Sequence, residues 1–224
     1  AYIDESVVNG SITGGKIWMT TFVALKHGDT SNPDDAVNLL NKVYVGTSEN
    51  LTFDLAGAPS GQNLFLMYTT SSPTIVDGRV TGATIIATGR DPANQSTGLS
   101  ITAGDTINTS QAGGPTTFGT NNQMIVQQEG IRYTFVTGAN AAYTVPNLDQ
   151  NEADVEANID FTAMLDAQSA AFDVVQLQSG KSAVVKITAL TSGLESGTAF
   201  IDGYYDDSVV AITLASVTVL DATG

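Results

Sequence analysis

Short runs of β-branched and aromatic residues, each closed by a turn signal, recur along this chain of 224 residues. Such runs occupy residues 43–45, 51–55, 64–68 and 84–87, with Gly, Pro, Asn and Ser between them. Short strands with turn signals roughly every eight to twelve residues are typical of β-sandwiches and barrels. No helical segments are spaced to connect parallel strands. The sequence therefore predicts an all-β fold, an antiparallel β-sandwich of the jelly-roll or immunoglobulin-like type.

The longest of these runs lies near the C-terminal end, at residues 209–220, and contains no Gly, Pro or charged residue. Successive side chains of a strand point to opposite faces of the sheet, so this run would place apolar atoms on both faces. Such a strand has to be covered on both sides, by its own domain or by another molecule. We expect it to form a central or groove-lining strand, while the opposite assignment, in which this run is the strand donated to a neighbour, stays open.

The N-terminal segment, residues 1–15, is polar and mixed, and it precedes the break expected at Gly14-Gly15. It predicts an N-terminal arm or edge strand that a neighbouring copy accepts as a donor strand, because a sheet edge offers free N–H and C=O groups. Residues 16–224 are expected to form a single β-sandwich domain, with a candidate subdomain boundary in the acidic, turn-rich segment 146–158. The apolar residues expected to mediate assembly are Tyr2, Ile3, Val7, Val8 and Ile12.

One segment departs from the β pattern. Asn32 suits a helix N-cap, Pro33 suits the first helical position, and Asp34 and Asp35 place negative charge in the first turn. The sequence therefore predicts one short helix near residues 33–41.

Turn chemistry gives further local predictions. The pair Asp77-Gly78 favours a hairpin turn, and Glu129-Gly130 marks a second hairpin. Residues 108–122 are dominated by Thr, Gly, Asn and Gln and predict a long exposed loop. Residues 198–205 predict a strand.

Residues 174–187, with the sequence VVQLQSGKSAVVKI, end an apolar run in a Gly turn and then begin an alternating run. This piece resembles a pattern common in immunoglobulin-like sandwiches of extracellular proteins. The resemblance implies a topology and no function, and the Cys and Trp of antibody domains are absent from it.

The charge balance excludes several partners. Acidic residues outnumber basic ones by 23 to 8, giving a net charge of −15. Nucleic acids and anionic membranes are bound mainly through clustered Lys and Arg, so neither is an expected partner. No apolar run approaches the length needed to span a bilayer, so we expect no membrane insertion. The chain has no Cys, which excludes disulfides and thiolate nucleophiles.

Little in the sequence points to catalysis, and we expect no catalytic residues. His27 is the single histidine and suits a surface position at a strand end. Residues 149–156 depart from a calcium loop, because Ala153 and Asp154 stand where a ligand and a glycine are needed. Calcium is the one cofactor considered, and its candidate ligands, which also suit a solvated loop, are Asp202, Asp206 and Asp207.

Surface chemistry suggests an exposed protein. Thr and Asn are abundant and Lys is scarce, as in many extracellular or virion proteins. The start at Ala1 suits cleavage of a signal peptide, and equally removal of an initiator Met. Candidate glycosylation sites of the Asn-X-Ser/Thr type are Asn9, Asn50, Asn94 and Asn108.

Three functions remain open. The first is a non-enzymatic structural subunit that polymerises with copies of itself into an extracellular, pilus-like filament at the cell surface, linked by β-strand donation. The second is a virion structural protein of a tail tube, decoration or capsid. The third is a carbohydrate-binding β-sandwich module that stacks sugars on Trp18, Tyr204 or Tyr205.

Overall fold

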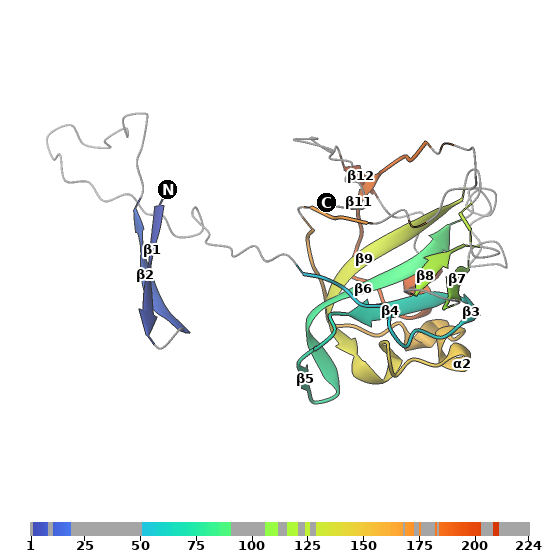
Figure 1. Cartoon of the computed structure of the whole chain (residues 1–224), viewed down its shortest axis with the longest axis horizontal. Coiled ribbons are helices and arrows are strands. Elements are labelled where there is room, and N and C mark those ends of the chain that lie inside the picture. The colour runs from blue at the N-terminus through green and yellow to red at the C-terminus, as the bar shows by residue number, and fades with distance from the viewer. Residues whose placement is uncertain are drawn as a thin grey trace, which may run out of the picture. The chain divides into compact units, whose positions relative to one another are not determined.

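The computed structural model contains two compact units, Ala1–Glu49 and Asn50–Gly224 (Figure 1). The residues that the structure describes are 2–8, 11–18, 51–90, 106–111, 116–120, 124–125, 129–167, 169–172, 175, 182, 184–202 and 208–210. The helix expected at residues 33–41 lies outside this set.

The first unit contains an antiparallel hairpin of β1 (Tyr2–Val8) and β2 (Ser11–Trp18). In the sequence, Asn9-Gly10 stands between the strands, and this dipeptide favours two-residue hairpin connections. The break expected at Gly14-Gly15 is wrong, because Gly14 pairs with Ser6 and Gly15 with Glu5 inside β2. The register shifts between Ser6 and Val7, and glycine is common at such bulges because it lacks a Cβ.

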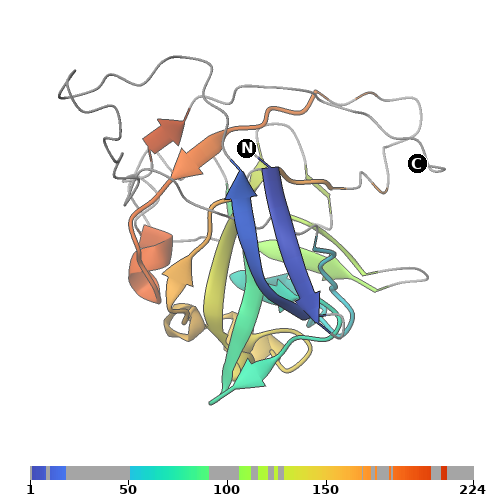
Figure 2. The ribbon, with the colours of Figure 1, turned by 90° about the vertical axis from the view of Figure 1, so that its left-hand side faces the viewer.

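The second unit is built on one antiparallel sheet in the order β10–β9–β6–β4. Its strands are β4 (Phe65–Thr69), β6 (Arg79–Arg90), β9 (Gly130–Asn140) and the two-residue β10 (Ala163–Met164). Figure 2 shows β6 and β9 side by side along their length, with β10 beside β9. Most described elements are antiparallel strands and the helices are short, so the all-β prediction is confirmed at the level of class.

The hairpin predicted at Asp77-Gly78 is confirmed. It joins β5 (Ile75–Val76) to β6, and both turn residues have positive φ, 49° at Asp77 and 76° at Gly78. Two consecutive positive φ values define the type I′ turn, whose twist matches that of paired strands. Asp and Gly are among the residues that tolerate this conformation.

A second sheet has the order β3–β7–β8, formed by β3 (Gly61–Asn63), β7 (Ile107–Ser110) and β8 (Thr117–Gly119). The long exposed loop predicted for residues 108–122 is therefore wrong. Polarity suggested exposure, but Thr109 is buried and its hydroxyl donates to the Pro59 carbonyl. Threonine is β-branched and fits a strand well once its hydroxyl has a partner.

The acidic segment 146–158 does not separate two subdomains. It contains α2 (Gln150–Ala153) and the 3-10 turn η3 (Glu156–Asn158), which follow an earlier 3-10 turn, η2 (Ala141–Tyr143). Leu148, Ala153 and Ile159 are buried and belong to the same core cluster as the central sheet. The candidate boundary is wrong because these apolar residues anchor the segment, although its acidic residues stay at the surface.

Asp149 and Glu152 form a capping box on α2. The Glu152 amide donates to Asp149 Oδ1 at 2.9 Å, and the Asp149 amide donates to Glu152 Oε2 at 3.0 Å. We predict that Asp149→Ala lowers the free energy of unfolding by about 1 kcal/mol, as is typical of a lost N-cap. Asp154→Ala is the matched control at the other end of α2, and urea unfolding should show a change within about 0.5 kcal/mol. Equal losses in the two variants would contradict the capping role.

Two further strand predictions are wrong among the described residues. Residues 198–202 form a short helix, α3 (Thr198–Asp202), which buries the consecutive residues Phe200 and Ile201. The alternating strand of the immunoglobulin-like pattern is not found at residues 182 and 184–188, and β11 (Ala189–Thr191) begins only beyond them. β11 pairs with β12 (Ser208–Val210), while the rest of the C-terminal run lies outside the described residues.

The core lies around β4 and β6 and extends to both sides of the central sheet. Phe65, Leu66, Met67 and Ile86 are fully buried there. On one side, Tyr68 of β4 meets Phe118 of β8 with ring centroids 6.2 Å apart, so the second sheet packs on the first through aromatic contacts. Within the described part of the chain, no helix is long and apolar enough to cross a membrane.

Candidate assembly surfaces

The expected assembly residues fall within one hairpin. Tyr2, Ile3, Val7 and Val8 lie in β1, and Ile12 lies in β2 opposite Val7. This segment therefore pairs with its own chain as a strand. A two-stranded hairpin is at best marginally stable alone in water. The hairpin gains stability if a third strand or another sheet joins it.

The other predicted sites are scattered or lie outside the described residues. Asp202 ends α3, while Asp206 and Asp207 lie outside, as do His27, Tyr204, Tyr205, Asn9, Asn50 and Asn94. Trp18 ends β2, opposite Tyr2. Among the described residues, no group of three or more acidic or histidine side chains is placed to hold a metal ion.

Asn108 is a poor glycosylation site in this fold. It lies in β7, the middle strand of its sheet, opposite Gln62 on one side and Gly119 on the other, and is 8% exposed. A glycan requires an asparagine at the surface. Asn108 is thus removed from the glycosylation candidates because its strand is buried.

One edge of the central sheet is closed. All five residues of β4 are buried. The Asp54 amide donates to the Thr69 carbonyl at 2.9 Å, and the Val145 amide donates to the Met67 carbonyl at 2.8 Å. Loop segments therefore use the outward backbone groups of β4, and this edge is not available to a partner strand.

Among the described residues, the opposite edge of the central sheet, along β9, is only partly covered. β10 pairs with Val136 and Thr137 of β9, and the Leu165 amide donates to the Phe135 carbonyl at 2.8 Å. In an antiparallel ladder, alternate residues direct their N–H and C=O to the same side. Since Phe135 and Thr137 direct theirs towards β10, Ile131 and Tyr133 do the same further along β9. No strand among the described residues pairs with that side of Ile131 and Tyr133.

The open end of β9 carries an aromatic side chain. Tyr133 is 40% exposed, and its ring lies 6.0 Å from that of Phe118. Burial raises the pKa of Tyr133 to about 12. Burial, and then the nearby Tyr133, raise the pKa of Tyr68 above its usual range.

These tyrosines predict a loss of stability in strong alkali. Their pKa in the unfolded chain is about 10, so above that pH the unfolded state loses protons that the folded state retains. The contribution of these two tyrosines to the free energy of unfolding should therefore stay constant below pH 10 and fall above it, and the fall due to Tyr133 should be complete near pH 12. Urea unfolding over this range should show a shallower fall in Tyr68→Phe and Tyr133→Phe. If the free energy of unfolding falls as steeply with pH in both variants as in the parent protein, these two tyrosines do not cause the loss of stability.

Arg132 covers the face of β9 opposite to the face on which Tyr133 lies. This side chain is buried, its guanidinium lies 5.0 Å from the centre of the Phe200 ring, and Nη2 donates to Ser192 Oγ at 2.7 Å. Phe200 also meets Phe161 edge to face at 5.9 Å. These contacts fix α3 against the sheet, so Arg132 has a structural role.

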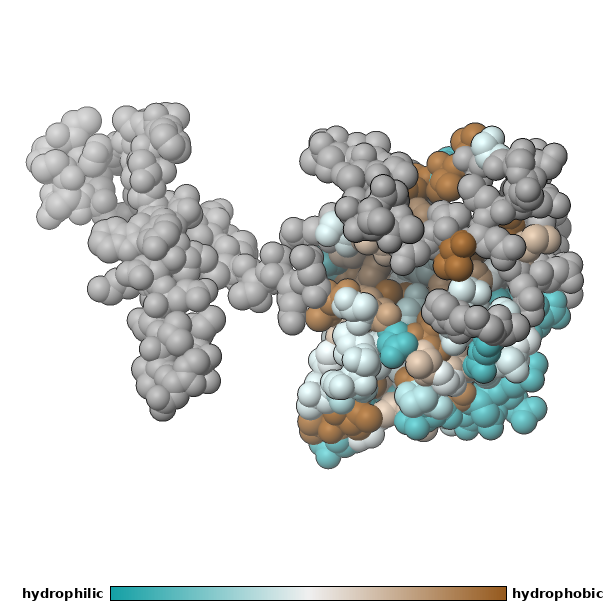
Figure 3. Space-filling view, in the orientation of Figure 1, coloured by the Kyte–Doolittle hydropathy of each residue, from teal (hydrophilic) through white to brown (hydrophobic). Residues whose placement is uncertain are grey.

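A third surface is apolar and lies upstream of β11. Val184, Val185 and Ile187, which we call the apolar strip, are 100%, 58% and 57% exposed. Figure 3 shows apolar surface at the upper end of this unit and at the β5 turn. Contiguous exposed apolar residues commonly mark a contact site.

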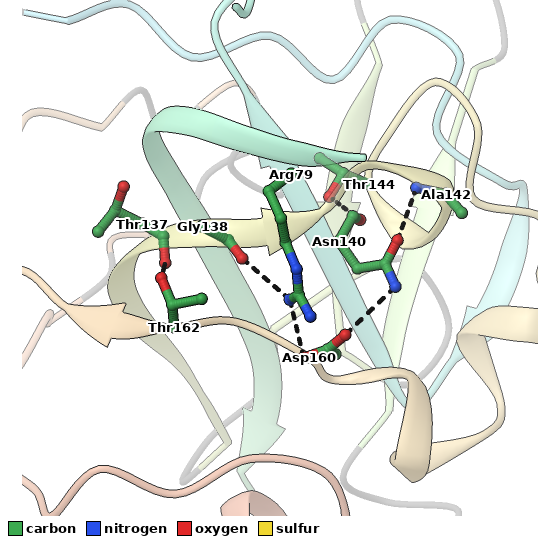
Figure 4. A network of polar contacts seen from close by, with 8 residues as sticks. All are labelled: Arg79, Thr137, Gly138, Asn140, Ala142, Thr144, Asp160 and Thr162. Atoms are coloured by element: carbon green, nitrogen blue, oxygen red, sulfur yellow. Dashed lines mark hydrogen bonds and ion pairs between the residues drawn. The ribbon is translucent and has the colours of Figure 1, made fainter. Parts of the chain in front are cut away.

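A polar network joins β6, β9 and the segment leading to β10 (Figure 4). Arg79 Nη1 lies 2.8 Å from Asp160 Oδ1 and donates to the Gly138 carbonyl at 3.1 Å. Asn140 Nδ2 donates to Asp160 Oδ2 at 3.2 Å. Both Asp160 oxygens therefore have partners, and the network is suited to holding strands together.

No family model, curated protein or solved structure significantly matches this chain.

Proposed function

We propose that this chain is a non-enzymatic structural subunit that assembles with copies of itself into an extracellular, pilus-like filament through β-strand donation. One observation carries the proposal: the N-terminal strands β1 and β2 pair with each other as a hairpin within the first compact unit, Ala1–Glu49. The described part of that unit contains no other strand or helix to cover the hairpin. A hairpin of this kind gains stability by joining a further sheet.

The open edge of β9 is the acceptor that best fits such a donor. Its outward N–H and C=O groups at Ile131 and Tyr133 are those an incoming strand uses, and the partly exposed Tyr133 adds apolar area. Each backbone hydrogen bond gained contributes about 1 kcal/mol, so an added strand that forms several of these bonds stabilises the junction by their sum. Under this proposal the two sheets of the larger unit form a β-sandwich whose open edge the neighbour completes.

The hairpin can be tested by deletion. We predict that the full chain forms filaments in negative-stain microscopy and elutes as large species in size-exclusion chromatography. Removing residues 1–18 should leave a folded monomer, shown by an unchanged β-type circular dichroism spectrum. Continued polymerisation of the truncated chain would exclude the hairpin as donor. Closed rings or shells would favour the virion role, and a stable full-length monomer retained on a polysaccharide column would favour the carbohydrate-binding module.

The acceptor edge has its own test. Tyr133→Lys places a charge on the open edge, a device by which natural sheets prevent edge pairing. Assembly should be lost while the monomer stays folded. Ile75→Lys is the matched control, because Ile75 is also an exposed apolar residue but lies in β5, away from that edge. Equal loss of assembly in both variants would show a general effect of charge and exclude β9 as the acceptor.

A further inference from the structure

A lysine interrupts the apolar strip. Lys186 stands between Val185 and Ile187, and the side chains of all three residues are exposed, as is that of Val184 before them. Residues 184–188 belong to no helix or strand. The backbone of residues 184–187 makes no hydrogen bond with any other described residue. The peptide bonds of this segment are therefore open to another molecule.

Such a segment has the properties of a protease substrate. A peptide that binds as an added strand needs free backbone N–H and C=O groups, and exposed segments without regular structure are preferred sites of proteolytic cleavage. Valine and isoleucine favour the strand conformation that such binding requires. Proteases that cleave after Lys or Arg hold that side chain in a pocket containing a carboxylate. Lys186 would occupy the pocket, with Val185 and Ile187 on either side.

The other described basic residues are protected. Lys16 lies in β2, Arg79 and Arg90 lie in β6, and Arg132 lies in β9. Cleavage within a paired strand requires local opening of the sheet, because the backbone groups that a protease binds are already used. Arg79 is also held by Asp160, and Arg132 is buried. Among the described Lys and Arg residues, Lys186 is the one that lies outside a strand.

We propose that the peptide bond between Lys186 and Ile187 is a processing site for a protease that cleaves after Lys or Arg, and that the cut chain stays together. Water adds across the bond, which leaves a carboxylate on Lys186 and an amino group on Ile187, and no other reactant is consumed. This inference is independent of the filament.

The fragment that begins at Ile187 is anchored by contacts that the cut does not touch. β11 and β12 both belong to this fragment and pair with each other. Phe200 of α3 is 1% exposed and lies beneath the guanidinium of Arg132, which belongs to the other fragment. The Gly197 amide also donates to the Ile159 carbonyl at 2.6 Å, across the two fragments. Burial of an aromatic side chain and these polar contacts would hold the fragments together.

The site can be tested by brief treatment of the native full chain with a small amount of trypsin. Intact mass should show residues 1–186 and 187–224 as the first products. Lys186→Gln should slow this cut about tenfold or more, because the carboxylate in the protease pocket loses its partner. Lys186→Arg is the matched control and should be cut as fast as the parent protein. Ile187→Pro should also block the cut, because proline lacks the N–H and has a rigid ring.

Two results would overturn the site. One is a first cut after any other basic residue, and the other is cleavage at this bond that stays equally fast in Lys186→Gln.

The anchoring has a separate readout. After the cut, the two fragments should elute together in native size-exclusion chromatography and separate only on a denaturing gel. Phe200→Ala should release the C-terminal fragment, whereas Leu194→Ala, which truncates a side chain that is 65% exposed, should retain it. Separate elution of the fragments of the cut parent protein, or equal retention in both variants, would overturn the anchoring through Phe200.

Discussion

Gly138→Ala is expected to lower the free energy of unfolding by about 3 kcal/mol, through backbone strain and steric overlap together. Gly138 has a φ of 70°, a conformation that side-chain-bearing residues rarely adopt. A Cβ there would overlap Thr162 Oγ1 and lie 2.9 Å from Thr162 Cγ2. Thr162 is held in place because its hydroxyl donates to the Thr137 carbonyl at 3.1 Å (Figure 4). Urea unfolding would measure the loss.

Variants of two other glycines distinguish the effect of backbone strain from that of steric overlap. Gly78 has a φ of 76° but nothing within 4 Å of an added Cβ, so Gly78→Ala should show backbone strain alone, about 1 kcal/mol. Gly82 has neither feature, and Gly82→Ala should change stability by less than about 0.5 kcal/mol. Adding Thr162→Ala to Gly138→Ala should recover part of the loss. Equal losses of stability at all three glycines would exclude the overlap with Thr162 as the cause of the loss in Gly138→Ala.

Phe200→Ala is expected to lower the free energy of unfolding by about 3–5 kcal/mol, the usual range for a buried phenylalanine. Phe200 is 1% exposed, contacts Phe161, and lies beneath the Arg132 guanidinium. Its removal would leave a cavity and take away the aromatic ring that Arg132 covers. For a domain of this size, such a loss corresponds to a fall in melting temperature of roughly 10 °C.

Phe172→Ala is the control for this prediction. Phe172 is 55% exposed, and its truncation should change stability by less than about 0.5 kcal/mol. Comparable losses in the two variants would mean that α3 is not anchored through Phe200.

Local chemistry made some elements predictable. The strand at residues 64–68 and the Asp77-Gly78 turn follow from β-branched or aromatic content and from tolerance of positive φ, both of which act over a few residues. The capping box has an equally local signal, since Asp149 precedes Glu152 by three positions in a run that departs from a calcium loop. Residues 198–202 were misassigned because Phe200 and Ile201 pack in a helical turn that propensity does not favour.

The candidate site was predictable only in part. The N-terminal segment was expected to take part in assembly, and the structure shows it as a strand of a hairpin. The open edge of β9 was not foreseen, because nothing in Ile131 or Tyr133 indicates that β10 is only two residues long and ends before reaching them. The residues of the apolar strip belong to the alternating run that the immunoglobulin-like pattern predicts as a strand, and the structure has no strand there.

The sequence by itself determined that this chain forms short antiparallel strands and where several of them lie. It also determined the hairpin turn at Asp77-Gly78. Both follow from the sequence because side-chain alternation and turn geometry depend on neighbouring residues. Only the tertiary structure decided which strands pair, that the polar strand β7 is buried, and which edge of the central sheet is left without a partner strand among the described residues. Those outcomes depend on contacts between residues far apart in the chain, such as Asn63 with Ile107 and Arg79 with Asp160. The physical reason is that a strand's burial is set by what covers it, which its own residues do not specify.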